Sequence, residues 1–183
     1  MFIAQQLRKQ NIVEYLLYMW QIEDLIRAFE FDMDKVEKHI IAPYQLADGD
    51  KKKLYEWYES LISMMKDENV QEAGHLQLNK NVIIQLNDFH AEMMKSEKDA
   101  SYNANFYKIL PLLNQLRQSQ PDSGISDIEL CYNFLYGIMT LRLSKKEISP
   151  ETQKAQADFT KFLALLNKYY QLYVVGELSF EED

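Results

Sequence analysis

Apolar residues recur at helical spacing along nearly the whole chain, and few residues interrupt them. Only 5 Gly and 4 Pro occur in 183 residues. Because these two residue types are the strongest local breakers of regular structure, their scarcity favours long helices. No segment shows the sustained apolar–polar alternation of a strand between turn signals. We therefore expect an all-α fold, a single bundle of six to seven helices without a sheet.

The helices are placed by apolar periodicity and by the residues that start or stop a helix. We expect helices at about residues 3–29, 34–41, 51–65, 78–95, 102–118, 127–141 and 150–173. Ser126 and Glu129 have the spacing of a capping box, and Ser149-Pro150 suits an N-cap followed by N1. Pro111 falls inside the fifth helix and predicts a kink there.

The chain length suits one domain, residues 1–183. Its last segment, residues 176–183, reads GELSFEED, and this acidic tail is expected to fray. The longest uncharged run near the N-terminus has eight residues, Tyr15 to Ile22, where a membrane span needs roughly 20. The lone Cys131 excludes an internal disulfide. We expect no membrane partner and a cytoplasmic location.

The net charge of the chain is −8, from 28 acidic and 20 basic residues. A polyanion would be repelled by the average surface, so nucleic acid is not an expected partner. Metal-binding helical bundles use two E-x-x-H pairs, whereas this chain has one, Glu72 to His75, in an expected connection. We expect no metal site and no cofactor.

The most informative segment is EYLLYMWQIEDLIRAF, residues 14–29. A helix of this sequence is apolar almost all round, which indicates a central helix or one at a subunit interface. It nevertheless carries Glu23, Asp24 and Arg27. Glu23 and Asp24 reach Arg27 at spacings i,i+4 and i,i+3, both of which favour a pair.

Three interpretations of these charges are open. Since an unpaired buried charge is very costly, the three residues could form an internal ion-pair network. They could instead line a polar pocket in which Arg27 binds an anionic ligand. They could also lie at the rim of a subunit interface.

Two further groups of residues are candidates for function. His90 lies on the apolar side of its helix, where we interpret it as a core histidine bonded to a polar neighbour such as Asn87. If it met Glu23 or Asp24, it could act as a general base. The segment KYYQLYVV offers Tyr169, Tyr170 and Tyr173 either for docking another chain or for closing the end of the bundle.

Several segments are similar to a known family: IAQQLRKQNIVEYLLYMWQIEDLIRA, GHLQLNKNVI, KKEISPETQ and FLALLNKYY. With the chain length, they resemble domain-of-unknown-function family 4924, all-helical proteins of Bacteroidetes. The resemblance implies a similar fold and a bacterial cytoplasmic setting. It implies no catalytic residue, cofactor or partner.

The motifs of nucleotide-binding loops and nucleophile elbows are missing from the sequence. We therefore expect a non-enzymatic module that binds another protein or itself, for instance as a homodimer. The alternative is a small-molecule-binding protein or an enzyme, with an unknown ligand and a buried polar centre at Glu23, Asp24, Arg27 and His90.

Overall fold

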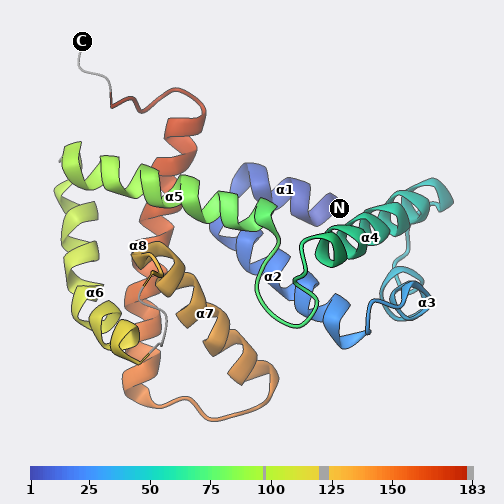
Figure 1. Ribbon diagram of the computed structural model, residues 1–183. Helices are drawn as coiled ribbons and strands as arrows, with labels where there is room; N and C mark the ends of the chain where they lie inside the picture. Colours follow the sequence, from blue (N-terminus) through green and yellow to red (C-terminus); the bar gives the residue numbers. More distant parts are fainter. Residues whose placement is uncertain (97, 120–123, 181–183) are drawn as a thin grey trace. The chain divides into compact units, whose positions relative to one another are not determined.

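The structure is a computed structural model that describes residues 1–96, 98–119 and 124–180, and every regular element in these ranges is helical (Figure 1). The expectation of an all-α fold is confirmed. Contacts divide the chain into two compact units, Met1–Val82 and Ile83–Asp183. No helix in the described ranges has the length and apolar character needed to cross a membrane.

The first unit contains five elements and the start of a sixth: α1 (Phe2–Gln10), α2 (Ile12–Ala28), α3 (Met33–Val36), the π-helical turn η1 (Glu37–Ile41), α4 (Asp48–Asp67) and the first residues of α5 (Gln77–Ser96). The second unit contains the rest of α5, α6 (Ala100–Gln118), α7 (Asp127–Leu143) and α8 (Pro150–Val174). The described ranges thus hold eight α-helices, one more than the upper expected number.

The additional helix arises at Asn11, which divides the expected helix 3–29 into α1 and α2. Asn11 has an extended backbone (φ −152°, ψ 94°), and its side chain accepts hydrogen bonds from the backbone N–H groups of Val13 and Glu14, both at 3.2 Å. Asparagine is among the strongest N-cap residues. The expectation of one long first helix was wrong. The apolar periodicity continues through Asn11, although the backbone there is not helical.

Helix α2 provides much of the core of the first unit. The sequence predicts a helix that is apolar almost all round, and residues on different sides of it are buried, among them Val13, Leu16, Trp20 and Ile26. Helix α1 packs against α2, and α4 contacts both α3 and η1. An apolar helix of this kind is stable only when several neighbours cover it.

In the second unit, α8 contacts both α6 and α7. Its buried face is formed by Phe159, Phe162, Leu163 and Leu166. The expected helix starts are confirmed: the hydroxyls of Ser126 and Ser149 accept hydrogen bonds that cap α7 and α8. Pro111 lies inside α6, which continues to Gln118.

The expected acidic tail begins where α8 ends. Gly176 has a φ of +79°, a conformation that favours glycine, and Glu177 N–H donates to the carbonyl of Leu172 at 2.8 Å. Further on, the Phe180 ring lies 5.6 Å from the Tyr173 ring, centroid to centroid. Residues 181–183 of the tail lie outside the described ranges.

The cap at Asn11 can be tested by substitution. Asn11→Ala removes the acceptor of two N–H groups and should lower the free energy of unfolding by about 1 kcal/mol. Asn11→Asp keeps a capping oxygen and should cost much less. Urea unfolding followed by circular dichroism measures both; equal losses in the two variants would show that the side-chain cap does not stabilise α2.

Candidate functional site

The charges of α2 face the connection between α4 and α5. Helix α4 ends where Asn69 takes a left-handed conformation (φ 55°) and Val70 N–H donates to the carbonyl of Met65 at 3.0 Å. This pairing is the Schellman arrangement of helix C-termini. Residues 70–76 then lead to α5 without regular structure of their own, so side chains from elsewhere must hold them.

Glu23 holds the end of this connection. Its carboxylate is 1% exposed, and Oε1 accepts hydrogen bonds from the backbone N–H of Leu76 (2.9 Å) and from Nδ2 of Asn79 (2.7 Å). The other oxygen, Oε2, lies 2.6 Å from Nδ1 of His75. The carboxylate therefore sits at the N-terminus of α5, where the helix dipole favours a negative charge. Three hydrogen-bonding partners offset the cost of burying it.

The position of His75 is fixed from a second side. Trp20, one turn before Glu23 on α2, stacks on the imidazole with the ring centroids 4.0 Å apart and the ring planes 10° from parallel. In the sequence, His75 belongs only to an incomplete metal motif, and Asn79 is not predicted as a site residue. The signal available was indirect: a buried Glu23 requires donors, and His75 and Asn79 have the spacing of one helix face.

Arg27 holds the middle of the connection. Its Nη2 donates to the carbonyls of Val70 (3.0 Å) and Gly74, and its Nε to that of Val70 (3.4 Å). Gly74 has a φ of +86°, which favours glycine. Asp24, with a half-exposed side chain, accepts from Nη1 at 2.7 Å, so the expected pair Asp24–Arg27 is confirmed. The other expected partner, Glu23, binds the start of α5 instead of Arg27.

These contacts explain why an apolar helix carries Glu23, Asp24 and Arg27: two of the charges fasten a connection that has no regular structure, and the third neutralises the guanidinium. An anionic ligand at Arg27 would have to displace the carbonyls of Val70 and Gly74. Ligand binding at this centre stays a prediction.

His90 is placed in the second unit as a core residue. It is 7% exposed, its Nδ1 lies 2.7 Å from the Tyr102 hydroxyl, and the Phe106 ring lies 4.5 Å away, centroid to centroid. Burial lowers the pKa of His90 from its ordinary 6.5 to about 4. The polar neighbour is therefore Tyr102, and the histidine that meets Glu23 is His75.

The tyrosines of the KYYQLYVV segment have different surroundings. The Tyr169 hydroxyl donates to Oδ2 of Asp99, whose other oxygen caps α6 by accepting from Tyr102 N–H at 2.9 Å. These hydrogen bonds hold the pKa of Asp99 below its usual value. Tyr170 and Tyr173 instead pack against the ring of Phe89, and Tyr173 is 46% exposed.

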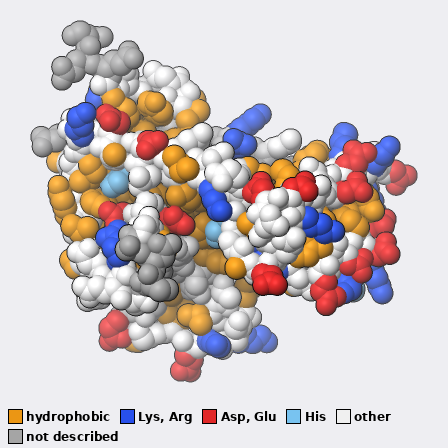
Figure 2. Space-filling view, viewed as in Figure 1, with side chains coloured by type: hydrophobic (Ala, Val, Ile, Leu, Met, Phe, Trp, Pro, Cys, Tyr) orange, Lys and Arg blue, Asp and Glu red, His pale blue; other side chains and the backbone are white. Residues whose placement is uncertain are grey.

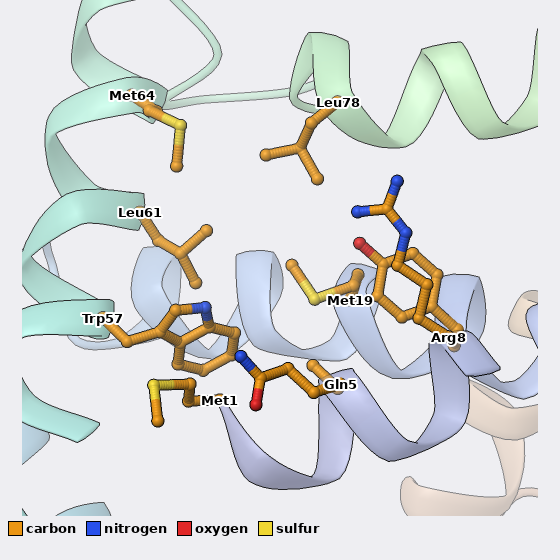
Figure 3. A pocket seen from close by; sticks show the side chains of 10 residues that line it. Met1, Gln5, Arg8, Met19, Trp57, Leu61, Met64 and Leu78 are labelled. Carbon is orange, nitrogen blue, oxygen red and sulfur yellow. The ribbon is translucent and has the colours of Figure 1, made fainter. Parts of the chain in front are cut away.

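A pocket of about 290 Å³ lies between α1, α2, α4 and the start of α5 (Figure 3). Its lining is mostly apolar and rich in methionine: Met1, Ala4, Met19, Trp57, Leu61, Met64 and Leu78, with Gln5, Arg8 and Tyr15 as its polar members. In Figure 3, Arg8 lies across the pocket from Trp57 and Leu61. The guanidinium carbon of Arg8 stands 5.6 Å from the centre of the Tyr15 ring, a cation–π contact.

A smaller apolar hollow of about 120 Å³ lies beside this pocket and shares Met1 with it. Its other lining residues are Phe2, Ile3, Tyr18, Tyr44, Leu46, Leu54 and Tyr58. Phe2, Ile3 and Tyr44 are exposed at its edge, while burial raises the pKa of Tyr18 to about 12. Neither hollow is predictable from the sequence, because the walls come from segments far apart in the chain.

Comparison with known proteins gives the family of the chain. A family model described as a domain of unknown function, DUF4924, matches residues 1–177. The chain belongs to this family. Neither a curated protein nor a solved structure matches the chain significantly. In the part that the structure describes, no three His, Cys, Asp or Glu side chains gather in a way that could hold a metal ion.

The role of Glu23 can be tested by stability. Glu23→Ala leaves the buried groups of Leu76 and Asn79 without their acceptor and should lower the free energy of unfolding by about 3 kcal/mol. Amide hydrogen exchange should also become faster at Leu76. The matched control is Glu14→Ala, an exposed glutamate in the same helix, which should cost less than about 1 kcal/mol. Similar losses in both variants would contradict the anchoring role.

The low pKa of His90 predicts a pH dependence. The unfolded chain binds a proton at His90 below pH 6.5, whereas the folded chain binds it only near pH 4. Stability is therefore lost as the pH falls through this window, by about 3 kcal/mol in total. His90→Phe should remove this part of the slope. Urea unfolding between pH 4 and 7 measures the difference; parallel slopes would contradict it.

Proposed function

We propose that the protein is a non-enzymatic binding module whose first unit takes up an apolar segment of a protein partner. The proposal rests on one observation: two neighbouring apolar hollows share Met1 and are bordered by exposed Phe2, Ile3 and Tyr44. A continuous apolar surface of this kind suits an extended partner better than a single compact molecule. Grooves that bind amphipathic helices have this character.

The lining supports a partner that inserts large apolar side chains. Methionine is flexible and polarisable, so methionine-rich surfaces adapt to different apolar partners. A volume of about 290 Å³ lies at the small end of ligand pockets. The pocket therefore suits one or two anchoring side chains such as Leu, Phe or Met.

The positive charge of Arg8 at the pocket favours a partner that carries a carboxylate. Among the described residues, Arg8 has no carboxylate at ion-pair distance, although it stands at the pocket. A carboxylate next to the apolar anchors would pair with it. The net charge of −8 disfavours nucleic acid as the partner. Over α3 and α4, Lys and Arg are interspersed with Asp and Glu, so this surface has no continuous basic patch (Figure 2).

A small amphipathic carboxylate is a second candidate occupant. Gln5, Arg8 and the Tyr15 hydroxyl are the polar groups of a mostly apolar lining, the arrangement that orients a ligand with an acidic head and an apolar body. On this alternative the protein is a small-molecule carrier or an enzyme. The residues predicted from the sequence as a ligand site, Glu23, Asp24, Arg27 and His90, would then stabilise the fold and would not bind the ligand.

The proposal is tested by selecting displayed helical peptides of random sequence on the whole protein. Selected peptides should carry apolar residues at helical spacing and at least one Asp or Glu. Met64→Glu places a charge in the pocket and should weaken their binding at least tenfold. Leu143→Glu, an equal change at an exposed position of the second unit, should leave binding unchanged.

Two further measurements separate the other occupants. Sedimentation over a range of concentrations shows whether a second copy is the partner, since self-association should then be lost in Met64→Glu. Titration with dodecanoate, followed by tryptophan fluorescence, tests the small carboxylate. Peptide binding that is the same in Met64→Glu, or no peptide selected while dodecanoate binds, would overturn the proposal.

A further inference from the structure

The second unit has a hollow of its own, of about 370 Å³, between α5, the C-terminal end of α8 and Phe180. Its lining combines four aromatic rings with two carboxylates and an amide: Phe89, Tyr170, Tyr173, Phe180, Asp88, Glu92 and Gln85. This composition differs from that of the first-unit pocket, which is rich in methionine and carries an arginine but, among the described residues, no carboxylate.

The aromatic rings form a cluster around Phe89, which is buried. The ring centroids of Tyr170 and Tyr173 lie 5.4 Å from that of Phe89, and the centroid of Phe180 lies 5.7 Å from it. The three rings are inclined to Phe89 by 81°, 45° and 57°. All four rings line the hollow, and the faces of aromatic rings are electron-rich. A cation within about 6 Å of such faces is attracted by each of them.

The carboxylates add a full negative charge to this environment. Asp88 and Glu92 are exposed and lie one helical turn apart on α5. Like charges at this spacing repel each other. Neither forms an ion pair with any residue that the structure describes. A cation in the hollow would relieve the repulsion.

An ammonium group of the protein itself already approaches this cluster. Nζ of Lys98 stands 6.0 Å from the centre of the Phe180 ring. The chain thus shows, on one of the four rings, the interaction that an external cation would make with several.

We propose that this hollow binds a small organic cation with an alkylated ammonium group. Aromatic rings beside carboxylates are the combination that recognises quaternary ammonium ligands, because the methyl groups pack on the rings while the charge faces the carboxylates. The volume of about 370 Å³ exceeds that of the head group alone and accommodates a cation of the size of choline. The site is independent of the apolar pocket proposed for a protein partner.

The test uses the whole protein with choline, its neutral isostere 3,3-dimethylbutan-1-ol, and sodium ions, by calorimetry and ligand-observed NMR. Choline should bind saturably, and its N-methyl protons should shift upfield because they lie over aromatic faces. The neutral alcohol should bind at least tenfold more weakly, and sodium should not compete at equal concentration. A trimethyllysine peptide distinguishes a protein side chain from a free cation.

Matched variants locate the site. Tyr173→Leu should weaken choline binding at least fivefold, and the double variant Asp88→Asn with Glu92→Gln at least tenfold. Tyr107→Leu and Glu147→Gln change an exposed tyrosine and an exposed glutamate elsewhere in the unit and should have no effect. All these positions are exposed, so unfolding temperatures should stay close to that of the parent protein.

Three results would overturn the proposal. One is the absence of saturable choline binding up to about 10 mM. Any binding free energy would then be smaller in magnitude than about 3 kcal/mol. Another is equal binding of choline and its neutral isostere, which would reduce the site to an apolar hollow. The third is binding of the trimethyllysine peptide without binding of choline, which would assign the rings to a protein partner.

Discussion

The buried carboxylate of Glu23 is the interaction on which the first unit depends. It joins α2 to the start of α5 through Leu76 and Asn79, and it orients His75 against Trp20. Leu78, which lies between the two anchored residues in sequence, lines the apolar pocket. The buried charge therefore has a geometric consequence, because it fixes where one wall of the pocket stands.

Glu23, Asp24 and Arg27 make their hydrogen bonds within the protein. Arg27 binds the backbone carbonyls of the connection, and Asp24 neutralises it. The sites that we propose for recognition lie elsewhere: an apolar pocket with Arg8 in the first unit and an aromatic hollow with Asp88 and Glu92 in the second. The pocket with Arg8 carries a positive charge and the aromatic hollow carries negative charges, so the first suits an anionic ligand and the second a cationic one.

Local signals in the sequence predicted much of the fold and little of the sites. Ser126 and Ser149 marked helix starts because capping depends on residues within one turn. The placement of His90 in a core followed from the apolar face on which it lies. Asn11 shows the limit of apolar periodicity as a signal: one helix ends and the next begins at this residue, while the apolar pattern continues through it. Local signals of this kind cannot predict the hollows, because the residues that line them come from separate helices.

The sequence by itself determined that the chain is helical, where most of its helices begin, and that the charges of EDxxR need partners once buried. Propensity, capping and the cost of burying a charge act over short distances along the chain. Only the tertiary structure decided that the partners are His75, Leu76 and Asn79 for Glu23 and the carbonyls of residues 70 and 74 for Arg27. These groups lie more than forty residues away in sequence, and no periodic pattern records which distant segments meet, because that is fixed by how the helices pack.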